Sequence, residues 1–321
     1  MKDYLIIDIG GTKTTAVVFN DQGEPVTDFR VKKSRTYEGK EAVFQNTVEL
    51  AYEILAEAGK TKEDICGIGV AAPGPLDYKT GLIIDVPMMG WKNFPLGKLL
   101  REEFGVPVFV ENDGNLGALA EANVGVAKGE NVVLYQTIST GCGGGIAIGG
   151  KIYHGRHGFA GEFGHVSIDF SGPNCGCGGS GCFELYASGS AMNSRMKRDI
   201  RNGIRSMAFE SIGYDAEKVN GKILSDAADK GDPYALSMFQ QEGRYIGTGL
   251  SNLINLFDPD AVVLAGGMVK ANKYFWYSMM NEIQRRVCFQ VEEDLIRISQ
   301  LNDKVVAYGA YVMVKTALDE K

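Results

Sequence analysis

Four side chains that bind borderline-soft metal ions are clustered near the middle of the chain, at His165, Cys175, Cys177 and Cys182. Three thiolates and one imidazole suit the tetrahedral shell of a structural zinc ion. Glycines 176, 178, 179 and 181 let the backbone turn sharply around such an ion. Two acids, Glu162 and Glu184, flank the cluster. We therefore predict a structural zinc that organises a binding site beside two carboxylates.

Two other interpretations of this cluster are weaker. The cysteines could be buried small residues, but only six occur in the chain and three of them fall within residues 175–182. A catalytic zinc is disfavoured, because four protein ligands leave no open coordination position. His165 could bind zinc through one ring nitrogen and offer the N–H of the other to a substrate. We expect the remaining histidines, His154 and His157, in loops or on the surface.

A glycine-rich turn near the start of the chain could bind phosphate. Asp8-Ile9-Gly10-Gly11-Thr12-Lys13 lies between the apolar stretches 4–10 and 16–19. Glycine lets backbone N–H groups approach an anion, while Thr12 adds a donor and Lys13 a charge. The alternative is an ordinary hairpin turn. The sequence fits neither the dinucleotide fingerprint nor Walker A.

A second glycine-rich turn favours the phosphate interpretation. Residues 139–145 contain Thr140, Gly141 and Gly143, and the strand is expected to resume at 146–148. Two such turns facing each other could hold a polyphosphate. Gly266-Gly267, after the predicted strand 261–265, is a third possible contact, suited to the face of a nucleoside. When this glycine pair is considered alone, an ordinary strand-to-helix turn is the better explanation.

Asp113 is the candidate general base. The predicted strand 106–111 ends at Asn112 and Asp113, and a helical pattern follows over 115–122. Asp113 could simply cap that helix. It could instead accept a proton from a substrate hydroxyl, with Asn112 holding the substrate.

The remaining predicted elements show a similar order of strands, turns and helices in the first and second halves of the chain. Strands are expected at 65–70 and 132–135, and helices at 41–58, over most of 186–256 and at 305–318. The layout of 8–18, strand then glycine turn then strand, returns at 138–148 and indicates a weak internal duplication. No long linker is present, so we expect two packed halves with a cleft between them.

Composition excludes several classes of protein. The chain has 321 residues and a net charge of -7, which argues against nucleic acid as a partner. No apolar run approaches the roughly 20 residues that span a bilayer. The cysteines are too sparse for a secreted disulfide scaffold, and the start has no signal-peptide layout. We therefore expect a cytoplasmic protein that does not bind membranes.

Over nearly its whole length the sequence resembles the ROK family of sugar kinases and repressors, in the actin and hexokinase superfamily. The 8–13 run resembles the family's first phosphate turn. The stretch from Ile138 to His165 resembles its signature, and Cys175-x-Cys177-x4-Cys182-x-Glu184 resembles its zinc motif. Many members carry glycine at the place of Ser139 and a branched aliphatic residue at that of Cys142, which bears only on nucleotide affinity.

The resemblance implies an α/β fold of two actin-like (ribonuclease H-like) domains around a nucleotide and sugar cleft. These would be 1–114 plus 302–321, and 115–301 with a zinc-binding insertion. It implies Asp113 as catalytic base and zinc at His165, Cys175, Cys177 and Cys182. The implied sugar ligands are Gly74, Asn112, Asp113, Glu162, His165 and Glu184. The implied ATP ligands are Asp8, Gly10, Gly11, Thr12, Lys13, Thr140, Gly141, Gly143, Gly266 and Gly267.

The expected activity is phosphorylation of a hexose by ATP and Mg²⁺, in a homodimer or homotetramer. Glucose is the first candidate, because Gly90-Trp91 and the run at 184–189 resemble glucokinases. Kinases of N-acetylmannosamine, N-acetylglucosamine, fructose or allose are the alternatives. A sugar-responsive repressor is disfavoured, because the first strand starts at Tyr4 with no room for a helix-turn-helix domain before it. An actin-like assembly protein is disfavoured by the zinc cluster and its acids.

Overall fold

The computed structural model describes residues 3–292 and 294–320, and it has a mixed α/β fold. The residues form two compact units. The first contains the chain up to Glu130, Gly145–Ala160 and the part from Gln300 onward; the second contains Asn131–Gly144 and Gly161–Ser299. The domain limits expected from the sequence, 1–114 with 302–321 and 115–301, remain a prediction.

The first unit is built on a five-stranded sheet of order β3-β2-β1-β4-β8. Its strands are β1 (Asp3–Ile9), β2 (Lys13–Phe19), β3 (Arg30–Lys33), β4 (Ile65–Ala72) and β8 (Val108–Asn112). β1 pairs antiparallel with β2 and parallel with β4, which pairs parallel with β8. The carboxyl ends of β1, β4 and β8 therefore lie at one edge of the sheet, where the candidate residues of this unit follow.

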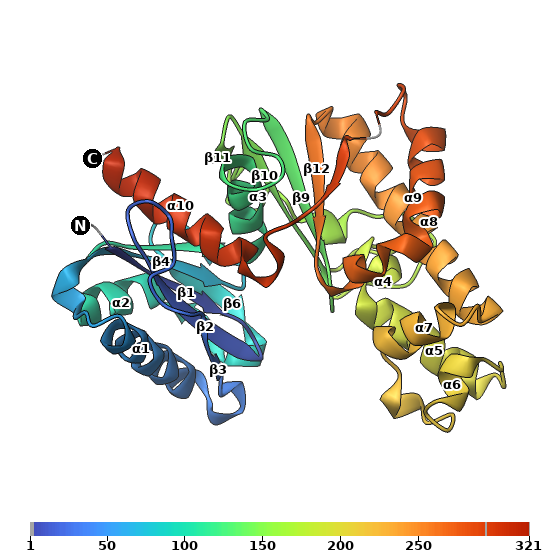
Figure 1. Cartoon of the computed structure of the whole chain (residues 1–321), viewed down its shortest axis with the longest axis horizontal. Coiled ribbons are helices and arrows are strands. Elements are labelled where there is room, and N and C mark those ends of the chain that lie inside the picture. Colours follow the sequence, from blue (N-terminus) through green and yellow to red (C-terminus); the bar gives the residue numbers. More distant parts are fainter. Residues whose placement is uncertain (1–2, 293, 321) are drawn as a thin grey trace. The chain divides into compact units, whose positions relative to one another are not determined.

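Helices cover both faces of this sheet (Figure 1). Alternate residues of β1 divide between the faces: Leu5, Ile7 and Ile9 pack with α1 (Lys40–Glu57), whereas Tyr4 and Ile6 pack with α10 (Val305–Asp319). This division follows from the two-residue period of a strand. α3 (Asp113–Asn123) packs against α10, and α2 (Leu96–Phe104) adds to the α1 face.

A small sheet is inserted between β4 and α2, with strands β5 (Leu76–Asp77), β6 (Leu82–Val86) and β7 (Trp91–Phe94). Trp91 is fully buried there. It stacks on Phe94 with ring centroids 4.7 Å apart and donates its indole N–H to the Lys40 carbonyl at 3.1 Å. The tryptophan that resembles the glucokinase branch is thus a core residue of this sheet.

A second five-stranded sheet has the order β11-β10-β9-β12-β13, with strands β9 (Val132–Ile138), β10 (Cys142–Ile148), β11 (Lys151–Ile152), β12 (Ala261–Ala265) and β13 (Ile296–Ile298). β12 pairs parallel with both β9 and β13, and β10 pairs antiparallel with β11. Strand for strand, this order repeats that of the first sheet. The repeated topology agrees with the duplication indicated by the two glycine turns.

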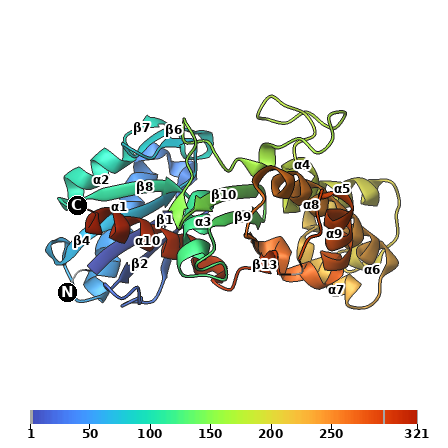
Figure 2. The same cartoon turned by 90° about the horizontal axis from the view of Figure 1, so that it is seen from above.

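The helical region predicted over 186–256 is present in the second unit. It comprises α4 (Glu184–Ala187), α5 (Gly189–Arg201), α6 (Met207–Glu210), α7 (Gly221–Ala228) and α8 (Pro233–Phe257). α8 lies beside α9 (Asn272–Arg286), as Figure 2 also shows. Among the described residues, no helix combines the length and the apolar character that crossing a membrane requires.

Candidate functional site

The first glycine turn joins β1 to β2, as predicted. It is closed by a hydrogen bond from the Gly10 N–H to the Lys13 carbonyl at 3.0 Å. The side chains of Thr12 and Lys13 are exposed, so both can reach a ligand in solvent. The buried Ser34 donates its hydroxyl to the Gly10 carbonyl at 2.6 Å, and its backbone N–H bonds the Thr12 carbonyl at 3.0 Å. Ser34 thus braces the turn, although no sequence motif marks it.

Asp8, the penultimate residue of β1, lies in a setting that disfavours its charge. Burial raises the pKa of its carboxyl to about 7, and the negative charge of Asp113 contributes to the rise. The Lys13 ammonium acts in the opposite direction, though less strongly. The first unit therefore brings Asp8, Lys13 and Asp113 within electrostatic range of one another, and a cation placed between the two acids would relieve their repulsion.

The β8–α3 junction shows which residue caps α3. Asn112 is the N-cap of α3, because its side-chain oxygen accepts the Gly114 N–H at 2.8 Å. Asp113 is the first helical residue; its carboxylate accepts the same N–H at 2.8 Å, and the side chain is exposed. Surrounding protein nevertheless raises the pKa of Asp113 by desolvation. With the cap supplied by Asn112, Asp113 is available as a base.

Two further residues complete this junction. Gly74 approaches Asn112 so closely that a β-carbon on it would lie 3.3 Å from the Asn112 amide nitrogen. The buried Glu111 binds His154, whose Nε2 lies 2.5 Å from the Glu111 Oε2. His154 lies in the loop after β11, one of the two expected settings, but its side chain is only 21% exposed and stacks on Tyr78. His157, in contrast, is exposed as expected.

The second glycine turn is shorter than the sequence indicated. Only residues 139–141 turn between β9 and β10; Gly143 and the two glycines after it lie within β10. They are small because neighbours pack closely: a β-carbon on Gly144 would lie 2.3 Å from Phe163, and one on Gly145 would lie 2.2 Å from the Gly114 carbonyl oxygen. The turn itself is held by the Gly189 N–H, which bonds the Ser139 carbonyl at 2.7 Å.

Gly266 lies against this second turn. It has a φ of 98°, and a β-carbon there would lie 2.3 Å from the Ile138 carbonyl oxygen. Only glycine combines that backbone conformation with that contact. A β-carbon on Gly267 would lie 3.9 Å from the Ser139 hydroxyl. The second unit thus brings Gly266-Gly267 beside the turn that contains Thr140 and Gly141.

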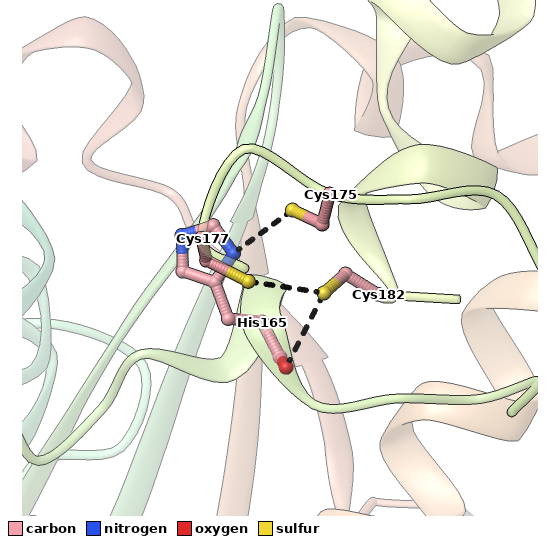
Figure 3. A group of neighbouring side chains, drawn as sticks. All are labelled: His165, Cys175, Cys177 and Cys182. Carbon is pink, nitrogen blue, oxygen red and sulfur yellow. Dashed lines mark hydrogen bonds between the residues drawn. The ribbon is translucent and has the colours of Figure 1, made fainter. Parts of the chain in front are cut away.

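The predicted zinc ligands converge on one point. The ligand atoms of His165, Cys175, Cys177 and Cys182 all lie within 4.8 Å of one another (Figure 3). Cys177 Sγ is 3.5 Å from Cys182 Sγ, and Cys175 Sγ is 3.7 Å from His165 Nδ1. A tetrahedral ion with Zn–S bonds of about 2.3 Å needs ligand separations close to these. The donor set and its geometry fit zinc.

Both predicted acids flank this cluster. Glu162 immediately precedes the short helix Phe163–His165, and its carbonyl accepts the His165 N–H at 3.1 Å. Glu184 starts α4, two residues after Cys182. Its carboxylate accepts the Cys142 N–H at 2.9 Å, next to Gly141. The second unit thereby joins the metal cluster, an acid and the second glycine turn in one connected arrangement.

Comparison with known proteins identifies the relationship. The ROK family model matches residues 4–317. The chain belongs to the ROK family. It is 34% identical over 272 residues to a glucokinase of Halalkalibacterium halodurans, covering 84% of this chain and 81% of that protein. It is also 34% identical over 240 residues to the xylose repressor of Bacillus spizizenii, covering 75% of this chain but only 58% of the repressor.

A solved ROK structure supports the same conclusion for the fold. The glucokinase of Streptomyces griseus, in complex with glucose and AMPPNP, superimposes with a TM-score of 0.80 at 31% identity and covers 96% of this chain and 97% of its own. The predicted α/β fold with two actin-like domains is confirmed. The kinase relatives also confirm the predicted class, an ATP-dependent sugar kinase.

Proposed function

We propose that this ROK-family chain transfers the γ-phosphoryl group of ATP to a hydroxyl of a hexose, with glucose as the first candidate. The observation that carries the proposal is the position of Asp113, at the carboxyl end of β8 with its carboxylate exposed. Glucokinases are among the relatives, and one was solved with glucose and AMPPNP. Both facts support glucose without excluding other hexoses.

Asp113 would accept the proton of the attacking hydroxyl. A general base works best when its pKa lies near the working pH. Desolvation raises the pKa of Asp113, which brings the carboxyl towards that range while its exposure leaves it accessible to substrate. The Gly114 N–H, 2.8 Å from the carboxylate, fixes its orientation.

The phosphates would bind to the two glycine turns. Gly10, Gly11 and Thr12 would contribute backbone N–H groups, and Lys13 would contribute charge. Thr140 and Gly141 would act similarly in the second unit, with Gly266 and Gly267 facing the nucleoside. Gly143 lies in β10 rather than in the turn, so we assign it a packing role.

Mg²⁺ would be held through Asp8 together with the phosphates. The carboxyl of Asp8 is destabilised by burial and by the charge of Asp113, so a cation would stabilise its ionised form. Bound Mg²⁺ would neutralise charge that develops on the phosphates. Asp8 and Lys13 would keep the phosphates oriented while Asp113 receives the proton.

The hexose ligands would be the polar groups that the family resemblance implies. Gly74 and Asn112 lie near Asp113, His165 belongs to the metal cluster, and Glu162 and Glu184 flank that cluster in the sequence. We propose that His165 binds zinc through Nδ1, the nitrogen near Cys175 Sγ, and donates a hydrogen bond to the sugar from Nε2. Zinc would then affect sugar affinity and take no part in phosphoryl transfer.

The experiment is a coupled ADP-release assay over glucose, mannose, fructose, allose, N-acetylglucosamine and N-acetylmannosamine, with calorimetry of sugar binding in parallel. We expect turnover with at least one hexose and the highest kcat/KM with glucose. Turnover with an N-acetylhexosamine alone would show that the substrate is not glucose, and the assignment as a sugar kinase would stand. Sugar binding without any phosphoryl transfer would favour a regulator like the xylose repressor relative.

We also propose a cytoplasmic location and a homodimer or homotetramer. Light scattering coupled to size-exclusion chromatography measures the assembly directly. A monomer at working concentration would contradict that part of the proposal.

A further inference from the structure

We infer that His154 is a positioning residue, which holds the sugar-binding and catalytic end of β8 through Glu111 on one side and Tyr78 on the other. The inference rests on the roles proposed above for Asn112 and Asp113. His154 itself need not contact any substrate.

Glu111 is the connection between His154 and the junction. It is 3% exposed, and its two oxygens serve different partners. Oε1 accepts the Asn112 backbone N–H at 2.8 Å and the Asn115 side-chain amide at 3.0 Å, whereas Oε2 meets His154 Nε2 at 2.5 Å. Because the carboxylate only accepts hydrogen bonds, Nε2 carries the proton in this pair. His154 therefore fixes the carboxylate that fixes the backbone of Asn112.

Tyr78 holds the opposite side of the imidazole. The two rings are stacked, with centroids 3.6 Å apart and planes 7° from parallel. Gly158, in the same loop as His154, also approaches this tyrosine: a β-carbon on it would lie 3.6 Å from Tyr78 Cδ1. The loop after β11 is thus packed onto the loop that follows β5.

These contacts join the His154 loop to two segments that carry candidate site residues. Tyr78 lies four residues after Gly74, and Gly74 lies directly against the Asn112 amide. The segments 74–78 and 154–158 are therefore both joined to the segment 111–115, and the His154 ring lies between Tyr78 and Glu111. An imidazole is suited to this place because it offers both a flat face to stack and an N–H at its edge.

Loss of the hydrogen bond between His154 and Glu111 should be costly. A buried carboxylate that loses a hydrogen-bond donor retains its desolvation cost, and it can recover only by moving or by admitting water. Any movement of Glu111 would be passed to the Asn112 N–H. Displacement of a reacting group by about 1 Å can lower the rate by a hundredfold.

Two variants of His154 distinguish its stacking on Tyr78 from its hydrogen bond to Glu111. His154→Phe keeps the stacking on Tyr78 and removes the donor to Glu111, and His154→Gln restores a donor without the flat ring. We expect H154F to lower kcat/KM for the sugar by about tenfold or more, with KM for ATP within about twofold of the wild type. H154Q should recover part of the loss. His157→Phe, which changes an exposed histidine in the same loop, is the matched control.

A double variant tests whether His154 acts through Glu111. Glu111→Gln combined with H154F should be no worse than the more damaging single variant, because both break the same link. The inference is overturned if a folded H154F keeps kcat/KM for the sugar within about twofold of the wild type, or if the losses of the two single variants multiply. If H154F does not fold, Tyr78→Leu tests the link from the stacked side: it should raise the sugar KM, and an unchanged KM would overturn the inference.

A failure of the positioning role of His154 can be distinguished from a failure of the proposed kinase function. If the wild type phosphorylates no sugar, the kinase proposal fails by itself. Calorimetry of sugar binding then still tests His154, because H154F should weaken binding about tenfold or more while H157F leaves it unchanged. Equal affinity in H154F, H157F and the wild type would overturn the positioning role.

Discussion

The Glu184 carboxylate accepts a hydrogen bond from the Cys142 backbone N–H at 2.9 Å, which ties the metal cluster to the start of β10. Glu184 follows Cys182 by two residues, and Cys142 follows the second glycine turn directly. The proposed sugar ligand and the proposed phosphate turn therefore share one structural connection. A substitution in Glu184 or in the second glycine turn should therefore alter the binding of both the sugar and ATP.

Replacement of Gly141 tests this connection. A β-carbon at this position would lie 2.4 Å from Glu184 Oε2, so Gly141→Ala must push the carboxylate away. We expect the sugar KM to rise by about tenfold to a hundredfold, in addition to any effect on ATP. Gly143→Ala is the milder comparison, because its β-carbon would lie 3.1 Å from the Thr137 methyl group. Steady-state kinetics with each substrate varied in turn measures both, and an unchanged sugar KM in G141A would contradict the connection.

Removal of the metal tests the role of the cysteine cluster. Cys175→Ser removes one of the four proposed ligands, so zinc content by mass spectrometry should fall well below that of the wild type. The sugar KM should rise by roughly tenfold or more, because His165 loses its support, while the ATP KM stays nearly constant. Cys288→Ser, at an exposed cysteine outside the cluster, is the control. Loss of zinc without any change in sugar KM would disprove the link between metal and sugar.

The Asp8 carboxyl should destabilise the folded state increasingly as the pH rises from 3.8 to about 7. Its pKa is raised from 3.8 to about 7, so between these values the folded chain keeps a proton that the unfolded chain releases. The folded state is therefore increasingly disfavoured as pH rises through this interval, and the penalty is constant above it. Asp8→Asn should raise the free energy of unfolding at pH 8 by more than about 1 kcal/mol, and by less at pH 4.5, while it lowers kinase activity.

Urea unfolding at the two pH values measures this effect. Asp85→Asn, at an exposed position on β6, controls for the loss of a carboxylate in the same unit. A D8N variant that is equally stabilised at both pH values, or destabilised at pH 8, would show that Asp8 is not held in the protonated form by its surroundings.

Trp91 should affect stability and not the choice of sugar. Its burial, its stacking on Phe94 and its hydrogen bond to the Lys40 carbonyl assign it to the core. Trp91→Phe leaves that carbonyl without its donor and should cost about 1–3 kcal/mol of unfolding free energy. The ranking of sugars by kcat/KM should not change. A changed ranking would mean that the small sheet senses the substrate.

The sequence predicted best the residues whose neighbours are local in the chain. The zinc ligands lie within residues 165–182 and are joined by glycine-rich loops, so their type and spacing predicted the cluster. Asp113 and the first glycine turn follow strands with clear apolar patterns. The repeated strand-turn-strand layout likewise agrees with two sheets of the same order.

Contacts that depend on tertiary packing could not be predicted in this way. Ser34 reaches the Gly10 carbonyl from 24 residues away, and His154 reaches Glu111 from 43 residues away. Consecutive glycines are typical of turns and predict Gly143 in a turn, yet it lies within β10, where Gly144 and Gly145 leave no space for a β-carbon. The N-cap of α3 is Asn112 and not its neighbour Asp113. Asparagine and aspartate are both favoured at N-caps, so side-chain propensity alone does not distinguish the two positions.

The most direct test of the account is the single-turnover rate of Asp113→Asn with ATP and the best hexose, measured beside the binding affinity of that hexose. We expect the rate to fall by about 10²- to 10⁴-fold, with sugar affinity close to that of the wild type. Asp226→Asn, on the exposed surface of α7, should behave as the wild type. A folded D113N variant that transfers phosphoryl groups at close to the wild-type rate would contradict the account.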